Sequence, residues 1–141
     1  KTKKSLVYLI KEKDKTYSLL SLNFIIDNDL ISDKKEINFL FDIIIDEIKL
    51  EKELMNLVIY KKALFNANSA DENGMLNILN PLLNSETIWK SEAQYLMAEF
   101  FYSKNEFQKS KEFFNEILKS DDASIEIKKK SQKRINRDLS E

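Results

Sequence analysis

The sequence predicts an all-α fold in which antiparallel helix pairs follow one another along the chain, and two observations support this. The chain has 141 residues but only one glycine and one proline, far fewer than the turns of a hairpin-rich sheet need. Apolar residues also recur at helical spacing along nearly the whole length. Because the expected connections are short, consecutive helices should be antiparallel neighbours. We therefore expect a single helical repeat domain over residues 1–141.

Eight helices are expected, and polar residues mark where some of them begin. Ser69 with Glu72, and Asn105 with Gln108, have the three-residue spacing of a capping box at a helix start. Pro81 should kink the fifth helix, because proline removes one backbone hydrogen bond. The expected helices cover residues 2–13, 15–27, 34–47, 51–66, 70–83, 87–104, 106–119 and 123–139.

Two stretches of the chain share one pattern of small, aromatic and turn residues. The first is YSLLSLNFIIDN followed by KEINFLFDIIIDE, and the second is QYLMAEFFYSKN followed by KSKEFFNEILKSD. Small side chains at Ala98 and Ser110 would let two helices approach where they cross, with Phe101, Phe107 and Phe114 closing around them. The matched positions are Ser21 with Ala98, Phe24 with Phe101, Asn28 with Asn105, Phe39 with Phe113, and Ile43 with Ile117.

This pattern resembles the tetratricopeptide repeat, whose period is ~34 residues and whose two helices carry small residues at matching places. Asn105 stands at the turn where that family favours glycine. From Leu79 onward, Pro81, Trp89 and Lys90 also make the chain resemble the tetratricopeptide-like domain of the YfgM-type ancillary subunits of the bacterial Sec translocon. The repeat pattern predicts a truncated first pair at 1–13, pairs at about 15–47, 51–83 and 87–119, and a capping helix at 123–139.

The composition argues against catalysis. The chain has no cysteine and no histidine, which excludes thiol and imidazole nucleophiles and cysteine-based zinc sites. Adjacent carboxylates fall at expected helix ends, where they cap a helix or are solvated, whereas acid–base catalysis needs two carboxylates in one cleft. We therefore expect no enzyme activity, no cofactor and no metal. These carboxylate pairs are Asp46-Glu47, Asp71-Glu72 and Asp121-Asp122.

The first helix of each pair in such a repeat lines the concave side, which predicts a protein-binding face. Apolar contacts and a few polar bonds from this face could hold an extended or helical peptide. The alternative is that the neighbouring helix at 51–66 covers the same residues. The predicted protein-binding residues are Leu22, Ile25 and Ile26 beside Ser18 in one helix, and Glu92, Tyr95, Glu99 and Tyr102 in another.

The last helix is basic, and the segment before it is rich in aromatic residues. The cations are expected to form the solvated face of a capping helix, with contact to anionic lipid headgroups or to an acidic partner as the alternatives. The aromatic residues are expected in the core. Trp89 is expected between adjacent repeats, with an exposed anchor for a protein partner as the alternative. The cations are Lys128, Lys129, Lys130, Lys133, Arg134 and Arg137, and the aromatic residues are Phe100, Phe101, Phe107, Phe113 and Phe114.

The family resemblance implies the partners and the location. It implies a soluble domain that faces the periplasm and binds translocon subunits, periplasmic chaperones or exported proteins, with the membrane reached only through an anchor upstream of Lys1. No apolar run in the chain reaches the ~18 residues of a membrane-spanning helix. A net charge of −1 gives no global field that favours nucleic acid. A free cytoplasmic or periplasmic scaffold, or a helper domain of a larger regulatory or enzymatic protein, are the alternatives.

Overall fold

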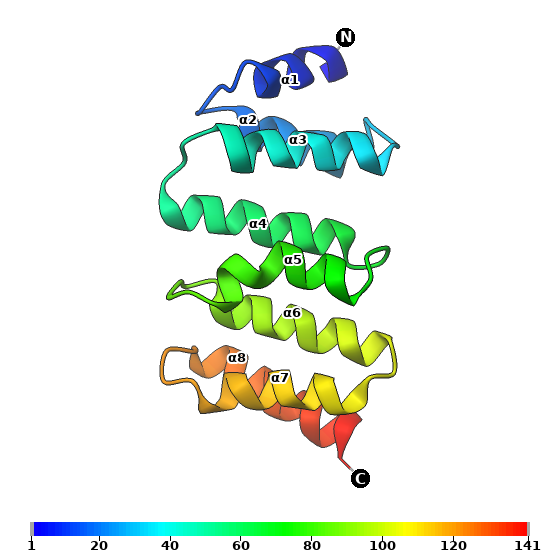
Figure 1. Cartoon of the computed structure of the whole chain (residues 1–141), viewed down its shortest axis with the longest axis vertical. Coiled ribbons are helices and arrows are strands. Elements are labelled where there is room, and N and C mark those ends of the chain that lie inside the picture. The colour runs from blue at the N-terminus through cyan, green and yellow to red at the C-terminus, as the bar shows by residue number, and fades with distance from the viewer. Residues whose placement is uncertain (1, 141) are drawn as a thin grey trace. The chain divides into compact units, whose positions relative to one another are not determined.

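The computed structural model describes residues 2–140, and within that range it is all-α, with no strand, as the sequence predicts (Figure 1). Consecutive helices make most of the contacts, which is the arrangement of an array of helix pairs. The helices are α1 (Thr2–Lys11), α2 (Ser18–Asp27), α3 (Lys34–Glu47), α4 (Lys52–Asn66), α5 (Glu72–Leu83), α6 (Lys90–Ser103), α7 (Phe107–Lys119) and α8 (Ile125–Arg134), and a π-helical turn η1 (Ile135–Leu139) continues α8.

The chain divides into two compact units, Lys1–Lys62 and Ala63–Glu141. In the first unit α1 packs most extensively on α2, and α3 contacts both of them. In the second unit α6 and α7 form the most extensive helix contact, with α5 packed on α6 and α8 packed on α7. A single repeat domain over 1–141 stays a prediction, and its first and last residues lie outside the described range.

Three helices end in the same way, with a residue in the left-handed backbone region. The φ angles of Lys13, Asp29 and Asn105 are 60°, 50° and 61°. In α6 the Asn105 N–H donates to the Tyr102 carbonyl at 3.0 Å, and the next N–H donates to the Phe101 carbonyl at 2.9 Å. This pair of bonds is the Schellman motif, which satisfies the last carbonyls of a helix.

The same two bonds recur at the ends of α1 and α2. After α2 the Asp29 N–H donates to Ile26, and the Leu30 N–H donates to Ile25. The expected match of Asn28 with Asn105 is therefore wrong by one residue, because Asp29 takes the left-handed position while Asn28 has a φ of −109°. At the turns after α2 and α6, Asp29 and Asn105 stand where glycine is usual, because Asp and Asn tolerate the left-handed conformation.

Two helices begin later than the sequence predicts, because a polar side chain forms a hydrogen-bonded turn just before each of them. The Asp14 carboxylate accepts hydrogen bonds from the Thr16 and Tyr17 N–H groups at 2.9 and 2.7 Å, so α2 begins at Ser18 rather than at 15. The Trp89 N–H donates to the Thr87 hydroxyl at 3.2 Å, so α6 begins at Lys90 rather than at 87. A side chain that accepts hydrogen bonds from nearby backbone N–H groups offers these groups an alternative to the helix, so the helix begins later in the sequence.

The cap of α5 also differs from the expected capping box. Asp71, not Ser69, caps the helix: its Oδ1 accepts from the Gly74 N–H at 2.8 Å. A Cβ on Gly74 would lie 3.1 Å from that same oxygen, so the single glycine of the chain lets the capping carboxylate approach. Pro81 lies inside α5, near its end. The expected cap pairing of Asn105 with Gln108 is not formed either, since the residue before α7, Glu106, makes no side-chain cap.

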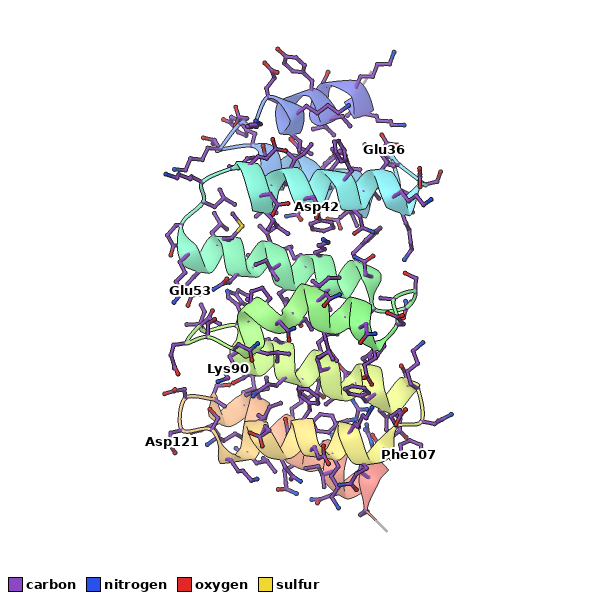
Figure 2. All side chains as sticks on the ribbon, in the orientation of Figure 1. Glu36, Asp42, Glu53, Lys90, Phe107 and Asp121 are labelled. Atoms are coloured by element: carbon purple, nitrogen blue, oxygen red, sulfur yellow. The ribbon has the colours of Figure 1, made fainter. Side chains whose placement is uncertain are left out.

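The crossing of α6 and α7 has the close packing that the small residues predict. Ala98 and Ser110 are completely buried, and the Ser110 hydroxyl donates to the Ala98 carbonyl at 2.7 Å. The rings of Phe101 and Phe113 stack with centroids 5.7 Å apart. Phe107, expected in the core, is instead half-exposed at the beginning of α7, at the opposite end from Asp121 (Figure 2).

Enlarging the side chain at this crossing should destabilise the protein. Ala98→Leu adds three carbon atoms where backbone and side chains already touch, and should lower the free energy of unfolding by about 1–3 kcal/mol. Urea unfolding followed by circular dichroism measures the change. Glu112→Leu, at an exposed position of α7, is the matched control and should change it little. Equal stability of Ala98→Leu and the unaltered chain would show that the crossing is not tightly packed.

The left-handed turn after α6 gives a second stability prediction. A β-branched residue is strained at positive φ, so Asn105→Val should cost about 1–2 kcal/mol of unfolding free energy. Asn105→Gly should be neutral or slightly stabilising, because glycine adopts this conformation freely. Gln108→Val, within α7, should cost only about 0.5 kcal/mol through helix propensity. The same cost for valine at both positions would contradict the assigned turn.

Candidate protein-binding surfaces

The predicted face of α6 is covered by the last helix of the chain. Tyr95 is buried, Glu92 and Tyr102 are half-buried, and Glu99 is exposed. The Lys130 Nζ lies 4.3 Å from the centroid of the Tyr95 ring. Of the two alternatives, an open or a covered face, the covered one therefore applies at Tyr95, and the last helix covers it. The prediction that these residues bind a partner is not tested by their burial.

A single arginine of the last helix contacts both α6 and α7. The Arg134 Nη1 donates to Glu99 Oε2 at 3.0 Å, and its Nε donates to Asp138 Oδ2 at 2.7 Å. Its Cζ lies 5.3 Å from the ring centroid of Tyr102 and 5.4 Å from that of Phe114. The Arg134 side chain is only 14% exposed. It is part of the packed interface and not of a solvated face.

Apolar contacts complete this interface. Ile127 and Ile135 of the last helix are buried with Tyr95, Ala98 and Phe114, and Leu139 packs at the edge of the cluster. Tyr95 meets Phe114 edge to face, with ring centroids 5.2 Å apart. Charge and ring contacts of this kind gain strength when they are partly removed from water. In the second unit the covering element is thus α8 with η1.

The predicted face of α2 is also closed at most positions. Ser18, Leu22 and Ile25 are buried and Ile26 is half-buried. Of the two alternatives, an open or a covered face, the covered one applies to these three residues, because α1 and α3 both pack on α2. Leu22 and Ile25 belong to the core of the first unit. Their predicted role in partner binding stays a prediction that would require this core to open.

The opposite side of α2 exposes three large apolar side chains. Tyr17 is 54% exposed, Leu20 61% and Phe24 49%. Tyr17 immediately precedes α2 with a right-handed helical backbone conformation, so the spacing of three and four residues places it in line with Leu20 and Phe24. We call Tyr17, Leu20 and Phe24 the α2 row. Single exposed apolar residues are common on protein surfaces, but a contiguous row is typical of a surface that binds another protein.

The repeat alignment assigned two of the aromatic residues of the first unit incorrectly. Phe24 was matched with Phe101, which is buried, and Phe39 with Phe113, which is half-buried, yet Phe24 and Phe39 are about half-exposed. A signal for this exposure was present in the segment SLLSLNFIID. A helix with apolar residues on every side cannot bury all of them in a small unit.

The carboxylates of residues 2–140 do not gather into a metal site, since no group of three or more such ligands lies together among them. Asp71 caps α5. Glu47 forms an ion pair with Lys13 at 3.1 Å, both side chains being about half-exposed. Asp121 lies in the loop between α7 and α8 (Figure 2), and like Asp122 it is exposed. None of these carboxylates has the buried paired arrangement that acid–base catalysis requires.

Comparison with known proteins gives no match to a protein-family model, a curated protein or a solved structure. The structure shows an all-helical protein with sequential helix packing. Among residues 2–140, no helix is both long enough and apolar enough to cross a membrane.

The Arg134 cluster should make stability depend on pH in the acid range. Arg137, and then Arg134, hydrogen-bond the Asp138 carboxylate and lower its pKa from 3.8 to about 2. A carboxyl group with a lowered folded-state pKa stabilises the fold above its ordinary pKa, and that stabilisation disappears as the pH falls to the folded-state value. Asp138→Asn should therefore be less stable than the unaltered chain at neutral pH, and the difference should shrink as the pH falls below 3.8 and disappear below about pH 2.

Urea unfolding at a series of pH values measures this difference. Asp122→Asn removes an exposed carboxylate from the loop before α8 and is the control, with no comparable pH-dependent difference expected. A difference between Asp138→Asn and the unaltered chain that stays constant from neutral pH to pH 2 would show that the carboxylate is not stabilised by the two arginines.

Proposed function

We propose that this protein is a non-catalytic, tetratricopeptide-like protein-binding domain. By its sequence resemblance, it serves an inner-membrane protein that associates with the Sec translocon and faces the periplasm. Its partners there are translocon subunits, periplasmic chaperones or newly exported chains. The observation that carries the protein-binding proposal is the α2 row, because it exposes three large apolar side chains, Tyr17 just before α2 and Leu20 and Phe24 on it.

The α2 row fits the apolar side chains of another polypeptide. Residues at spacings of three and four along one helix side can pack against an amphipathic helix or an extended apolar segment. Tyr17 and Phe24 supply large aromatic contact area, and tyrosine adds a hydroxyl that can donate a hydrogen bond. Newly exported chains expose apolar segments before they fold, which makes them suitable ligands for such a row.

The proposed site differs from the concave face that the repeat pattern predicts. The α6 part of that face is already in contact with Lys130 and Arg134 of the same chain. The α2 part is mostly core. A partner that uses the α2 row needs neither of these contacts to break, so the row is the simpler place for binding.

Site-specific photocrosslinking in cells tests the proposal. A photoreactive amino acid replaces Leu20 in the full-length protein, and captured proteins are identified by mass spectrometry. We expect translocon subunits, periplasmic chaperones or exported proteins. Phe24→Glu should reduce this capture several-fold, because it places a charge that must be desolvated within the apolar contact.

The matched control places the same photoreactive group at Lys119, which is exposed in the second unit and far from α2 in sequence. Equal capture from both positions would show that the α2 row is not a specific site. Capture of soluble cytoplasmic proteins only, dependent on Phe24, would retain a protein-binding row and reject the translocon assignment. Circular dichroism of Phe24→Glu must match that of the unaltered chain.

A further inference from the structure

The outward side of α8 and η1 carries a row of cationic side chains that the α6 interface does not use. Lys129, Lys133 and Arg137 follow one another at four-residue spacing, and all three are exposed. Together with Gln132 and Asn136 they line one shallow, open surface hollow. We call these five residues the basic face.

The opposite side of the same helix explains why this face points outward. Ile127, Ser131 and Ile135 are buried, and the Ser131 hydroxyl donates to the Ile127 carbonyl at 2.8 Å within the helix. Arg134 and Lys130 are held over the aromatic rings of α6 and α7. These contacts fix the rotation of the helix about its own axis, and the basic face is therefore directed toward solvent.

The charge of this helix contrasts with that of the rest of its unit. Residues 123–140 contain six cationic and two acidic side chains. Residues 63–122 contain five cationic and ten acidic side chains. One of the two acids, Asp138, is held by Arg134 and Arg137. The other, Glu126, is exposed on α8 itself. Within residues 2–140 neither Lys129 nor Lys133 forms an ion pair, so the two lysines present uncompensated positive charge.

We propose that the basic face docks the protein on a membrane surface through the headgroups of anionic phospholipids. The charge selects an anionic ligand, and the composition of the face favours a lipid surface over a protein. Protein interfaces are depleted in lysine and are anchored by aromatic residues, and the basic face contains no aromatic residue. Clusters of lysine and arginine on one side of a helix are typical of binding to anionic headgroups.

One exposed apolar side chain extends the face toward the beginning of the helix. Ile125 is 73% exposed and precedes Lys129 and Lys133 at the same four-residue spacing. From Ile125 to Arg137 the line spans about 18 Å at the rise of a helix, enough to meet several headgroups at once. Ile125 can enter the boundary between headgroups and acyl chains while the cations remain at the phosphates. Asp121, an exposed acidic residue, lies in the loop before α8 (Figure 2).

Co-sedimentation of the 141-residue chain with vesicles tests the proposal. Vesicles with about 30% phosphatidylglycerol in phosphatidylcholine should bind the chain at low salt, and pure phosphatidylcholine vesicles should not. Binding should be largely lost at about 0.5 M NaCl, where exposed charges are screened within a few ångströms. Lys129→Gln with Lys133→Gln should weaken binding by about tenfold to thirtyfold, since each cation near the surface contributes about a factor of five.

The control removes two positive charges at the same spacing in the other unit. Lys11 and Lys15 are both exposed, and Lys11→Gln with Lys15→Gln should bind nearly as well as the unaltered chain. Equal loss in both double variants would overturn the proposal, because only net charge would then matter. No binding to the anionic vesicles would also overturn it.

A further probe separates a membrane from an acidic protein. If polyglutamate binds the chain through Lys129 and Lys133 while the anionic vesicles do not, the face serves an acidic polypeptide and the lipid proposal is wrong. Circular dichroism checks that both double variants fold. The α2 row is unchanged in them, so failure of this proposal leaves the proposed protein binding at Leu20 and Phe24 unaffected.

Discussion

The close crossing of α6 and α7 is the constraint on which the second unit depends. Two helices can share the hydrogen bond from the Ser110 hydroxyl to the Ala98 carbonyl only if no large side chain separates them. That approach brings the ring of Phe114 to Tyr95 and the ring of Phe113 to Phe101. The aromatic surface formed in this way is what α8 covers. A change at Ala98 should therefore affect the last helix as well as the crossing itself.

Sequence reasoning could predict those parts of the fold that depend on local pattern. Helical periodicity places eight helices, because each must bury one apolar side. It also places Ala98 and Ser110 at a crossing, since only small residues fit there. The left-handed residue after α2 was misplaced by one position, because Asn28 and Asp29 both tolerate that conformation and local composition does not choose between them. In the structure Asp29 takes this conformation, and the N–H groups of Asp29 and Leu30 then donate to the Ile26 and Ile25 carbonyls at the end of α2.

The candidate surfaces were harder to predict, because they depend on which helix covers which. Phe24 and Phe101 occupy the same place in the repeat pattern, yet one is half-exposed and the other is buried. Neither segment contains a local sequence signal that predicts which helix packs on it. The basic residues of α8 appeared uniform in sequence, but Arg134 and the exposed Lys130 contact aromatic rings of α6 and α7, while Lys129 and Lys133 lie on the other side of the helix. Only the rotation of the helix on α6 and α7 separates the two sets.

That rotation lets one short helix serve two physical purposes. With so few apolar residues, this helix gains little stabilisation from hydrophobic burial alone. The contacts of Arg134 with Glu99 and with the rings of Tyr102 and Phe114 join this helix to α6 and α7, and they gain strength because the guanidinium is mostly removed from water. A charge used in this way is not available to a ligand. Lys129 and Lys133 are exposed and hold no ion pair among residues 2–140, so the proposed docking on an anionic surface would not require any of this packing to break.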